Sequence, residues 1–261
     1  MISDWIDDFE KVNRNALSVE WFVSPLEYFW PDGKQLFDKI FSSPSSPHTT
    51  FDEMVAPTIY KTSMQADFRA KMMVLAFMRQ DIAKSYGVEI ESGLMHLYRL
   101  DFISCLSQWI YVIEGYCRKL FSVTSLQNAK SNSWIIPTSG ELTLNRLIQA
   151  LSNSLANYLD GVMFRSTSDF HIERLNRHLL LHGNVQNKNF FNQKNCLLLM
   201  FALDALVVIE MVKNGDFPQV FNLREDEDKR IELRKHLYIK QIEHAFQDEN
   251  LLKMEILKEH L

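Results

Sequence analysis

Apolar residues recur at spacings of three and four along most of the chain, which is the period of an amphipathic helix. Four polar stretches interrupt this pattern, and each is rich in Ser, Asn, Gly or Pro. They cover residues 42–51, 122–140, 183–193 and 214–222. The pattern therefore predicts an all-α protein. Helices are expected over residues 1–17, 25–41, 64–87, 90–121, 142–159, 168–182, 194–212 and 224–260.

The composition agrees with this prediction. The 261 residues include only 8 Gly and 7 Pro, which favours long helices over a sheet with many hairpins. With 46% hydrophobic and 23% charged residues, the chain can bury a sizeable core. The formal net charge of −5 argues against a protein covered in positive charge for long stretches of nucleic acid, although a local basic site is compatible with it.

The most apolar run, residues 197–212, is expected to be a core helix. It contains Asp204 and Glu210, and it is shorter than the ~20 residues that a bilayer span needs. The acidic N-terminal sequence lacks the basic start and apolar core of a signal peptide. The three cysteines form no C-x-x-C pair, which argues against a disulfide framework or a thiolate zinc site. We therefore expect a cytoplasmic protein without a membrane association.

Residues 166–183, "STSDFHIERLNRHLLLHG", carry the strongest candidate chemistry. Ser168 suits the N-cap of a helix, and Gly183 suits the position after its last turn. One face of that helix is apolar and is expected to join the core through Ile172, Leu175 and Leu179. The other side gathers basic and imidazole groups that no core requires. They are His171, Arg174, Arg177, His178 and His182.

Three interpretations of these side chains compete. The first is a metal site, because His178 and His182 are four residues apart, as in helical zinc sites. However, Leu179 stands where the protease motif needs a glutamate, and His171 is the only obvious third ligand. The second is a structural role, because histidines near a helix C-terminus interact favourably with the helix dipole.

The third interpretation is phosphodiester chemistry without a metal. An imidazole titrates near neutral pH, so it can take a proton from a ribose 2′-hydroxyl or give one to the leaving oxygen. A guanidinium can hold the phosphate through two parallel hydrogen bonds and offset the charge of the transition state. An arginine and a histidine are therefore sufficient for a modest ribonuclease.

A family resemblance supports the third interpretation. The segment "RHLLLH" resembles the R-x4-6-H signature of the HEPN superfamily, in which Arg177 matches the arginine, His178 its polar follower and His182 the histidine. The wider phrase "LNRHLLLHGNV" is similar to a bacterial HEPN-like group in which N-R-H-x-x-x-H-G precedes an apolar helix. Residues 103–121, with Glu114 facing inward, look like the long helix before the motif. The resemblance covers about residues 90–215.

The resemblance implies a domain organisation and a function. It implies an N-terminal helical region over residues 1–87, a HEPN-type helical bundle over 88–215 and a C-terminal helical arm over 216–261. Many HEPN proteins are ribonucleases of toxin–antitoxin and antiphage defence systems. We therefore expect a metal-independent endoribonuclease that needs no cofactor. The alternative is a non-catalytic HEPN-like module for binding or dimerisation.

The resemblance also implies residue roles and partners. Arg177 would bind the scissile phosphate, and His182 would act as general base or acid. His178 and Asn176 would orient the phosphate or the imidazole, while Arg174 and Lys188 would hold the RNA backbone. The partners would be RNA, a second copy of the chain whose motif helix completes the site, and an antitoxin or regulatory protein. Residues 164–194 hold five Lys or Arg against two acids, a small basic site that suits a short RNA segment.

The C-terminal segment 224–260 has opposite charges three and four residues apart, which is typical of a solvated surface helix. A partner-binding or dimer-stabilising arm is the alternative, because this segment also contains many large apolar residues that need burial. They are Leu237, Ile239, Ile242, Phe246, Leu251, Leu252, Ile256 and Leu257.

Overall fold

The computed structural model describes residues 2–42, 48–122, 142–163, 175, 190–217 and 222–259. These residues form helices and no strand, so the predicted all-α class is confirmed. The helices are α1 Ile2–Leu17, α2 Pro25–Tyr28, α3 Pro31–Phe41, α4 His48–Ser63, α5 Ala66–Leu75, α6 Asp81–Ser85, α7 Gly87–Tyr98, α8 Phe102–Phe121, α9 Leu142–Tyr158, α11 Gln193–Lys213 and α12 Glu227–Glu259, with a 3-10 turn at Phe77–Arg79 and a π-helical turn at Leu159–Met163.

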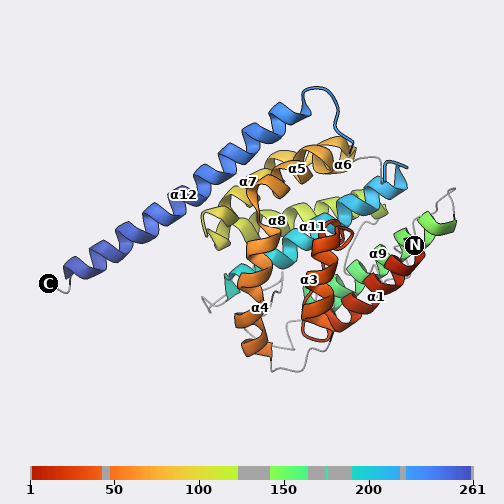
Figure 1. Ribbon diagram of the computed structural model, residues 1–261, viewed down its shortest axis with the longest axis horizontal. Helices are drawn as coiled ribbons and strands as arrows, with labels where there is room; N and C mark the ends of the chain where they lie inside the picture. The colour runs from red at the N-terminus through yellow and green to blue at the C-terminus, as the bar shows by residue number, and fades with distance from the viewer. Residues whose placement is uncertain are drawn as a thin grey trace.

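Helix α11 forms the centre of the fold (Figure 1). It packs against α8, α9, α2 and α4, and every residue from Asn195 to Val212 is buried. By length and composition this helix could cross a membrane, but its apolar window is 100% buried inside the protein. Since neighbouring helices cover it on all sides, it needs no polar face. The prediction of a core helix is confirmed.

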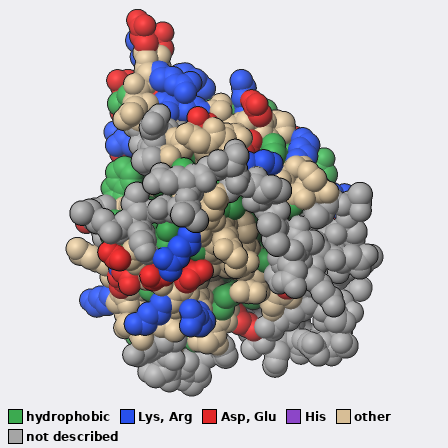
Figure 2. Space-filling model, turned by 90° about the vertical axis from the view of Figure 1, so that its right-hand side faces the viewer, with side chains coloured by type: hydrophobic (Ala, Val, Ile, Leu, Met, Phe, Trp, Pro, Cys, Tyr) green, Lys and Arg blue, Asp and Glu red, His purple; other side chains and the backbone are tan. Residues whose placement is uncertain are grey.

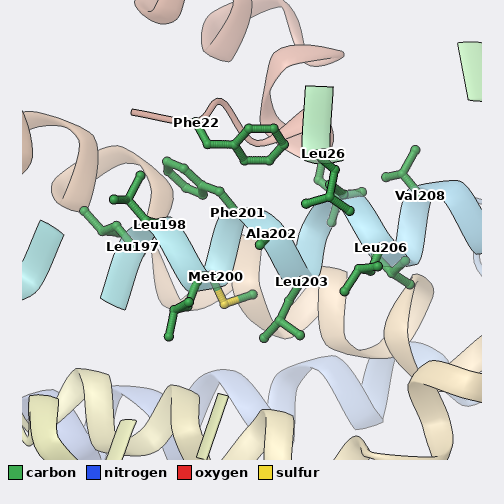
Figure 3. Close-up of a cluster of buried hydrophobic side chains, with 14 of the residues drawn as sticks. Phe22, Leu26, Leu197, Leu198, Met200, Phe201, Ala202, Leu203, Leu206 and Val208 are labelled. Carbon is green, nitrogen blue, oxygen red and sulfur yellow. The ribbon is translucent and has the colours of Figure 1, made fainter. Parts of the chain in front are cut away.

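The core around α11 includes residues from all three predicted segments. Phe22 and Leu26, from the N-terminal part of the chain, lie against the side of α11 that carries Phe201 and Ala202 (Figure 3). Buried apolar side chains also come from α8 and from the first half of α12. The N-terminal region and the central bundle therefore share one hydrophobic core.

Three of the expected helices are interrupted in the structure. Trp30 is extended, as is favoured before Pro31, and this divides the expected helix 25–41. The 3-10 turn at Phe77–Arg79 divides the expected helix 64–87. Leu100 has a φ of 60°, and Asp101 caps α8 by accepting a hydrogen bond from the Ser104 amide at 3.2 Å. Apolar periodicity continues across such breaks, so it does not reveal them.

One observed helix was not predicted. Helix α4 begins at His48, inside the expected loop 42–51, continues to Ser63 and includes Pro57 in its interior. Helix α12 begins at Glu227 and ends at Glu259, close to the expected 224–260. Its first half packs against α5 and α7, and its second half extends away from the rest of the protein (Figure 1).

Candidate functional site

The residues predicted to form the site lie outside the described part of the chain. This holds for Arg174, Asn176, Arg177, His178, His182 and Lys188, and also for His171. Within the expected motif helix the structure describes Leu175 alone, and this side chain is 1% exposed. The prediction that Leu175 belongs to the core is confirmed.

The chain is anchored in the core on both sides of the motif segment. Met163 and Phe190 are fully buried. After Phe190 the chain enters α11 through a capping interaction in which the Asn192 side chain accepts a hydrogen bond from the Asn195 amide at 2.8 Å. The Asn195 side chain donates to the Phe190 carbonyl at 2.8 Å. Met163 and Phe190, the nearest described residues on the two sides of the motif segment, therefore both belong to the core.

The structure changes the local charge balance near this segment. Lys194 was counted among the five basic residues of 164–194, but its ammonium lies 2.6 Å from a carboxylate oxygen of Asp52 on α4. The other oxygen of Asp52 accepts a hydrogen bond from the Trp21 indole at 2.7 Å. Because Asp52 neutralises it, Lys194 contributes little positive charge to an RNA site.

The described residues contain a different charged cluster, which joins α2, α5 and α11. Arg69 donates from Nη1 to both carboxylate oxygens of Asp204 at 3.0 Å and from Nη2 to Glu27. Its Nε donates to the Ser63 carbonyl at 2.6 Å. The Asp204 carboxylate also accepts from Ser24 at 2.6 Å, and Glu27 accepts from the Ser63 hydroxyl. No charged side chain of this cluster is more than 5% exposed.

The cluster holds two acids and one guanidinium, so its charge is unbalanced. Burial raises the pKa of Glu27 from 4.5 to about 7, although Arg69 lowers it; the Asp204 carboxylate adds to the rise. Burial also raises the pKa of Asp204, against the effects of Arg69 and Ser24. A net negative charge in the interior is unfavourable, and uptake of one proton by Glu27 near neutral pH removes it.

A second buried acid, Glu210, is held by dipoles. Its carboxylate accepts from the backbone amides of Ile82 and Ala83 at 2.8 and 3.2 Å, at the start of α6. It also accepts from the Tyr116 hydroxyl at 2.5 Å. Burial, together with the Glu210 carboxylate, raises the pKa of Tyr116 well above its usual value. The free amides of the first turn of a helix are natural partners for a carboxylate.

These two clusters determine how the helices pack. A carboxyl with a pKa near 7 beside an arginine is also found in active sites. Here the side chains of Glu27, Arg69 and Asp204 are buried, so a substrate cannot reach them. In the described part of the chain, no group of three or more His, Cys, Asp or Glu residues could hold a metal ion. We therefore assign the clusters to the architecture of the protein.

The sequence contained part of the signal for these clusters. Asp204 and Glu210 interrupt an apolar run, and buried acids require partners. The chain has 28 Lys and Arg residues, and nothing in the sequence marks Arg69 as the partner. Comparisons of the chain with protein-family models, with curated proteins and with solved structures found no match.

Proposed function

We propose that the protein is a metal-independent endoribonuclease of the HEPN type, in a toxin or antiphage defence system, which cleaves RNA between two copies of the chain. The observation that carries the proposal is the sequence "NRHLLLHG" at 176–183, directly after the buried Leu175. In a straight helix through these residues, Arg177 would lie far from the side of Leu175 and would be available for a ligand. His182, seven residues after Leu175, would lie on nearly the same side as Leu175, so a turn at the end of the helix would have to bring it toward the ligand.

The chemistry requires no metal or cofactor. Arg177 would bind the scissile phosphate and balance the charge that develops on its oxygens. His182 would take the proton of the ribose 2′-hydroxyl or protonate the leaving 5′-oxygen. The 2′-oxygen would form a bond to phosphorus while the bond to the 5′-oxygen breaks, which gives a 2′,3′-cyclic phosphate and a 5′-hydroxyl. Asn176 and His178 would orient these groups, and Arg174 and Lys188 would hold the RNA backbone.

The surrounding fold supports this proposal. The protein is all-α, and the long helix α8 precedes the motif while the buried helix α11 follows it. Glu114 of α8, expected to face inward, has a side chain that is 15% exposed and lies 3.7 Å from Arg118. Met163 and Phe190 are buried on the two sides of the motif segment. Catalytic groups need such a rigid support to stay in position.

A non-catalytic binding module is the second candidate, and the charge distribution favours it. The chain has a net charge of −5, and Lys194 is neutralised by Asp52. On the face in Figure 2 the described Lys and Arg side chains lie among acidic ones instead of forming a continuous basic surface. Such a surface would be poorly suited to long RNA, because phosphate contacts dominate affinity.

Two single substitutions test the proposed activity. Arg177→Ala and His182→Ala should each abolish cleavage of a short RNA, or toxicity in cells, while the melting temperature stays nearly unchanged. Leu175→Ala is the matched control, because loss of its buried side chain should cost roughly 2–5 kcal/mol of stability. If the His182→Ala protein is folded and cleaves like the wild type, the ribonuclease proposal fails.

Two further measurements separate the candidates. Cleavage should continue in the presence of a chelator, and its loss there would overturn the metal-independent mechanism. The wild-type chain should be a dimer in which Arg177 of both copies lies near the two-fold axis. RNA that binds but is never cut would favour the non-catalytic module.

A further inference from the structure

Helix α12 reaches well beyond the helices that support it. Its first half is tied to the body by ion pairs of Glu227 with Arg79 and of Arg234 with Glu91. The last described side chain of α12 that packs against the core is Ile242. The helix continues to Glu259, which at 1.5 Å per residue adds about 25 Å. Figure 1 shows this second half standing away from the other helices.

The extension lacks the packing that supports most helices in proteins. Beyond Ile242 no described side chain of α12 packs against the core, and such packing supplies most of the stability of protein helices. The supported half of α12 also carries large apolar side chains that the body does not cover. Leu233 is 72% exposed and Leu237 is 37% exposed, one turn further along the helix. Phe246, where the extension begins, is 63% exposed. Leu233 and Leu237 share one side of the helix and form an apolar surface that is open to another molecule, whereas Phe246, nine residues after Leu237, lies on the opposite side.

The charges of α12 indicate which molecule fits. Residues 227–240 contain five Lys or Arg and three acids, whereas residues 241–259 contain five acids and two Lys. Arg230 and Lys240 are exposed, and neither has an ion pair with any residue that the structure describes. A second α12 in antiparallel orientation would place its acidic half beside the basic half of the first. A parallel helix would place like charges together.

We propose that this surface binds a second copy of the chain, with the two α12 helices paired antiparallel about a two-fold axis. Residues 243–259 of each copy lie along the Leu233 and Leu237 side of the other. Both copies then use the same surface, as an isologous dimer requires. The apolar side chains leave water, and the extension gains the support that it lacks in the single chain. This surface differs from the motif segment 168–183, so the inference holds whether or not the protein is a ribonuclease.

The first test measures the mass of the full-length protein by light scattering over a range of concentrations. The wild type should be dimeric, and Leu233→Glu/Leu237→Glu should raise the dimer Kd about 100-fold or more. Val88→Glu is the matched control, because Val88 is 80% exposed on α7 and lies outside the surface. Circular dichroism should show that all three proteins are folded. A wild type that remains monomeric up to about 100 µM, or a double variant that dimerises like the control, overturns the proposal.

The second test examines the antiparallel orientation by exchanging charges. Arg230→Glu/Lys240→Glu should weaken the dimer, because acidic groups would then face the acidic half of the other helix. Adding Asp248→Lys/Glu249→Lys to the same chain should restore the dimer. Weakening without rescue overturns the antiparallel arrangement. The substitutions Arg177→Ala and His182→Ala should leave dimerisation through α12 unchanged, so a failure of the ribonuclease proposal can be recognised separately.

Discussion

Helix α11 carries two buried acids, and the protein stabilises them in different ways. Asp204 is bound by the Arg69 guanidinium, which Glu27 of α2 also contacts. Among the described residues no cation contacts Glu210, which instead accepts two backbone amides of α6 and the Tyr116 hydroxyl. The first acid depends on a charge from a distant part of the chain, and the second depends on oriented dipoles.

This difference has consequences for both stability and specificity. The Arg69 cluster joins three helices that are far apart in sequence, and its two acids compete for one cation. Its contribution should therefore depend on pH. The Glu210 cluster has three hydrogen-bond donors for one carboxylate, so its donors can all be satisfied by the ionised acid. Both clusters specify which helices pack together, because only the correct packing satisfies them.

The largest effect is expected from Arg69→Met. This change leaves Asp204 and Glu27 buried without their cation, and breaking a buried ion pair in this way costs about 3–5 kcal/mol. Chemical denaturation measures the loss in the free energy of unfolding. Arg146→Met is a suitable control, because the ion pair of Arg146 with Asp7 is about half exposed and should contribute less than about 1 kcal/mol. Equal losses in the free energy of unfolding of the two variants would show that the buried cluster contributes no more than an exposed ion pair.

Glu210→Leu should have the next largest effect. It removes the acceptor for the amides of Ile82 and Ala83 and for the Tyr116 hydroxyl, and buried donors without a partner cost about 1–3 kcal/mol each. We expect a total loss of about 2–4 kcal/mol, since α6 can shift to expose its amides to water. Hydrogen exchange should show faster exchange at the start of α6. Unchanged exchange there would mean that Glu210 does not hold α6.

The pH dependence of stability tests the competition within the Arg69 cluster. The folded-state pKa of Glu27, about 7, lies above its ordinary value of 4.5. Protonation of Glu27 therefore adds its full contribution to the free energy of unfolding below pH 4.5, and this contribution is lost as the pH rises to 7. Over this range the free energy of unfolding falls by at most about 1.4 kcal/mol per pH unit. Glu27→Gln should remove this part of the slope in denaturation experiments between pH 4.5 and 8. The same pH profile in wild type and variant would contradict the raised pKa.

Asp204→Asn tests whether the Asp204 carboxylate contributes to the raised pKa of Glu27. It leaves one acid for one guanidinium, so the repulsion that raises the pKa of Glu27 is removed. The pKa of Glu27 should fall, and the loss of stability should shift to lower pH. Carbon-detected NMR titration of the Glu27 carboxyl measures this directly. A pKa that stays near 7 would show that burial alone sets it.

Tyr116→Phe should have the smallest effect. It removes one hydrogen bond to the Glu210 carboxylate and leaves the two amide donors in place. We expect a loss of about 1–1.5 kcal/mol in thermal or chemical denaturation. Ser24→Ala removes one donor to Asp204 and should cost a similar amount. A much larger loss for Tyr116→Phe would mean that its hydroxyl, and not the amides, holds the Glu210 carboxylate in place.

Several elements could be predicted from the sequence, for a physical reason that applies locally. The apolar period is a property of consecutive residues, so α1, α9, α11 and α12 were located within a few residues of their observed ends. The run of apolar residues in α11 is longer than the apolar stripe of a surface helix, so the burial of α11 could be predicted. The chemistry at Arg177 and His182 was likewise derived from the types and spacing of neighbouring residues, and it remains a prediction.

Other features were decided only by the tertiary structure. The breaks at Trp30 and Leu100 redirect helices whose apolar pattern continues, because each piece packs against a different neighbour. The choice of Arg69 as the partner of Asp204 depends on two positions 135 residues apart, on α5 and α11, that meet only in the folded chain. By itself the sequence determined that the chain is helical, which segments are apolar enough to be buried, and where imidazole and guanidinium gather. Which charges meet in the interior was decided by packing, because a buried charge is tolerated only where the folded chain brings a partner to it.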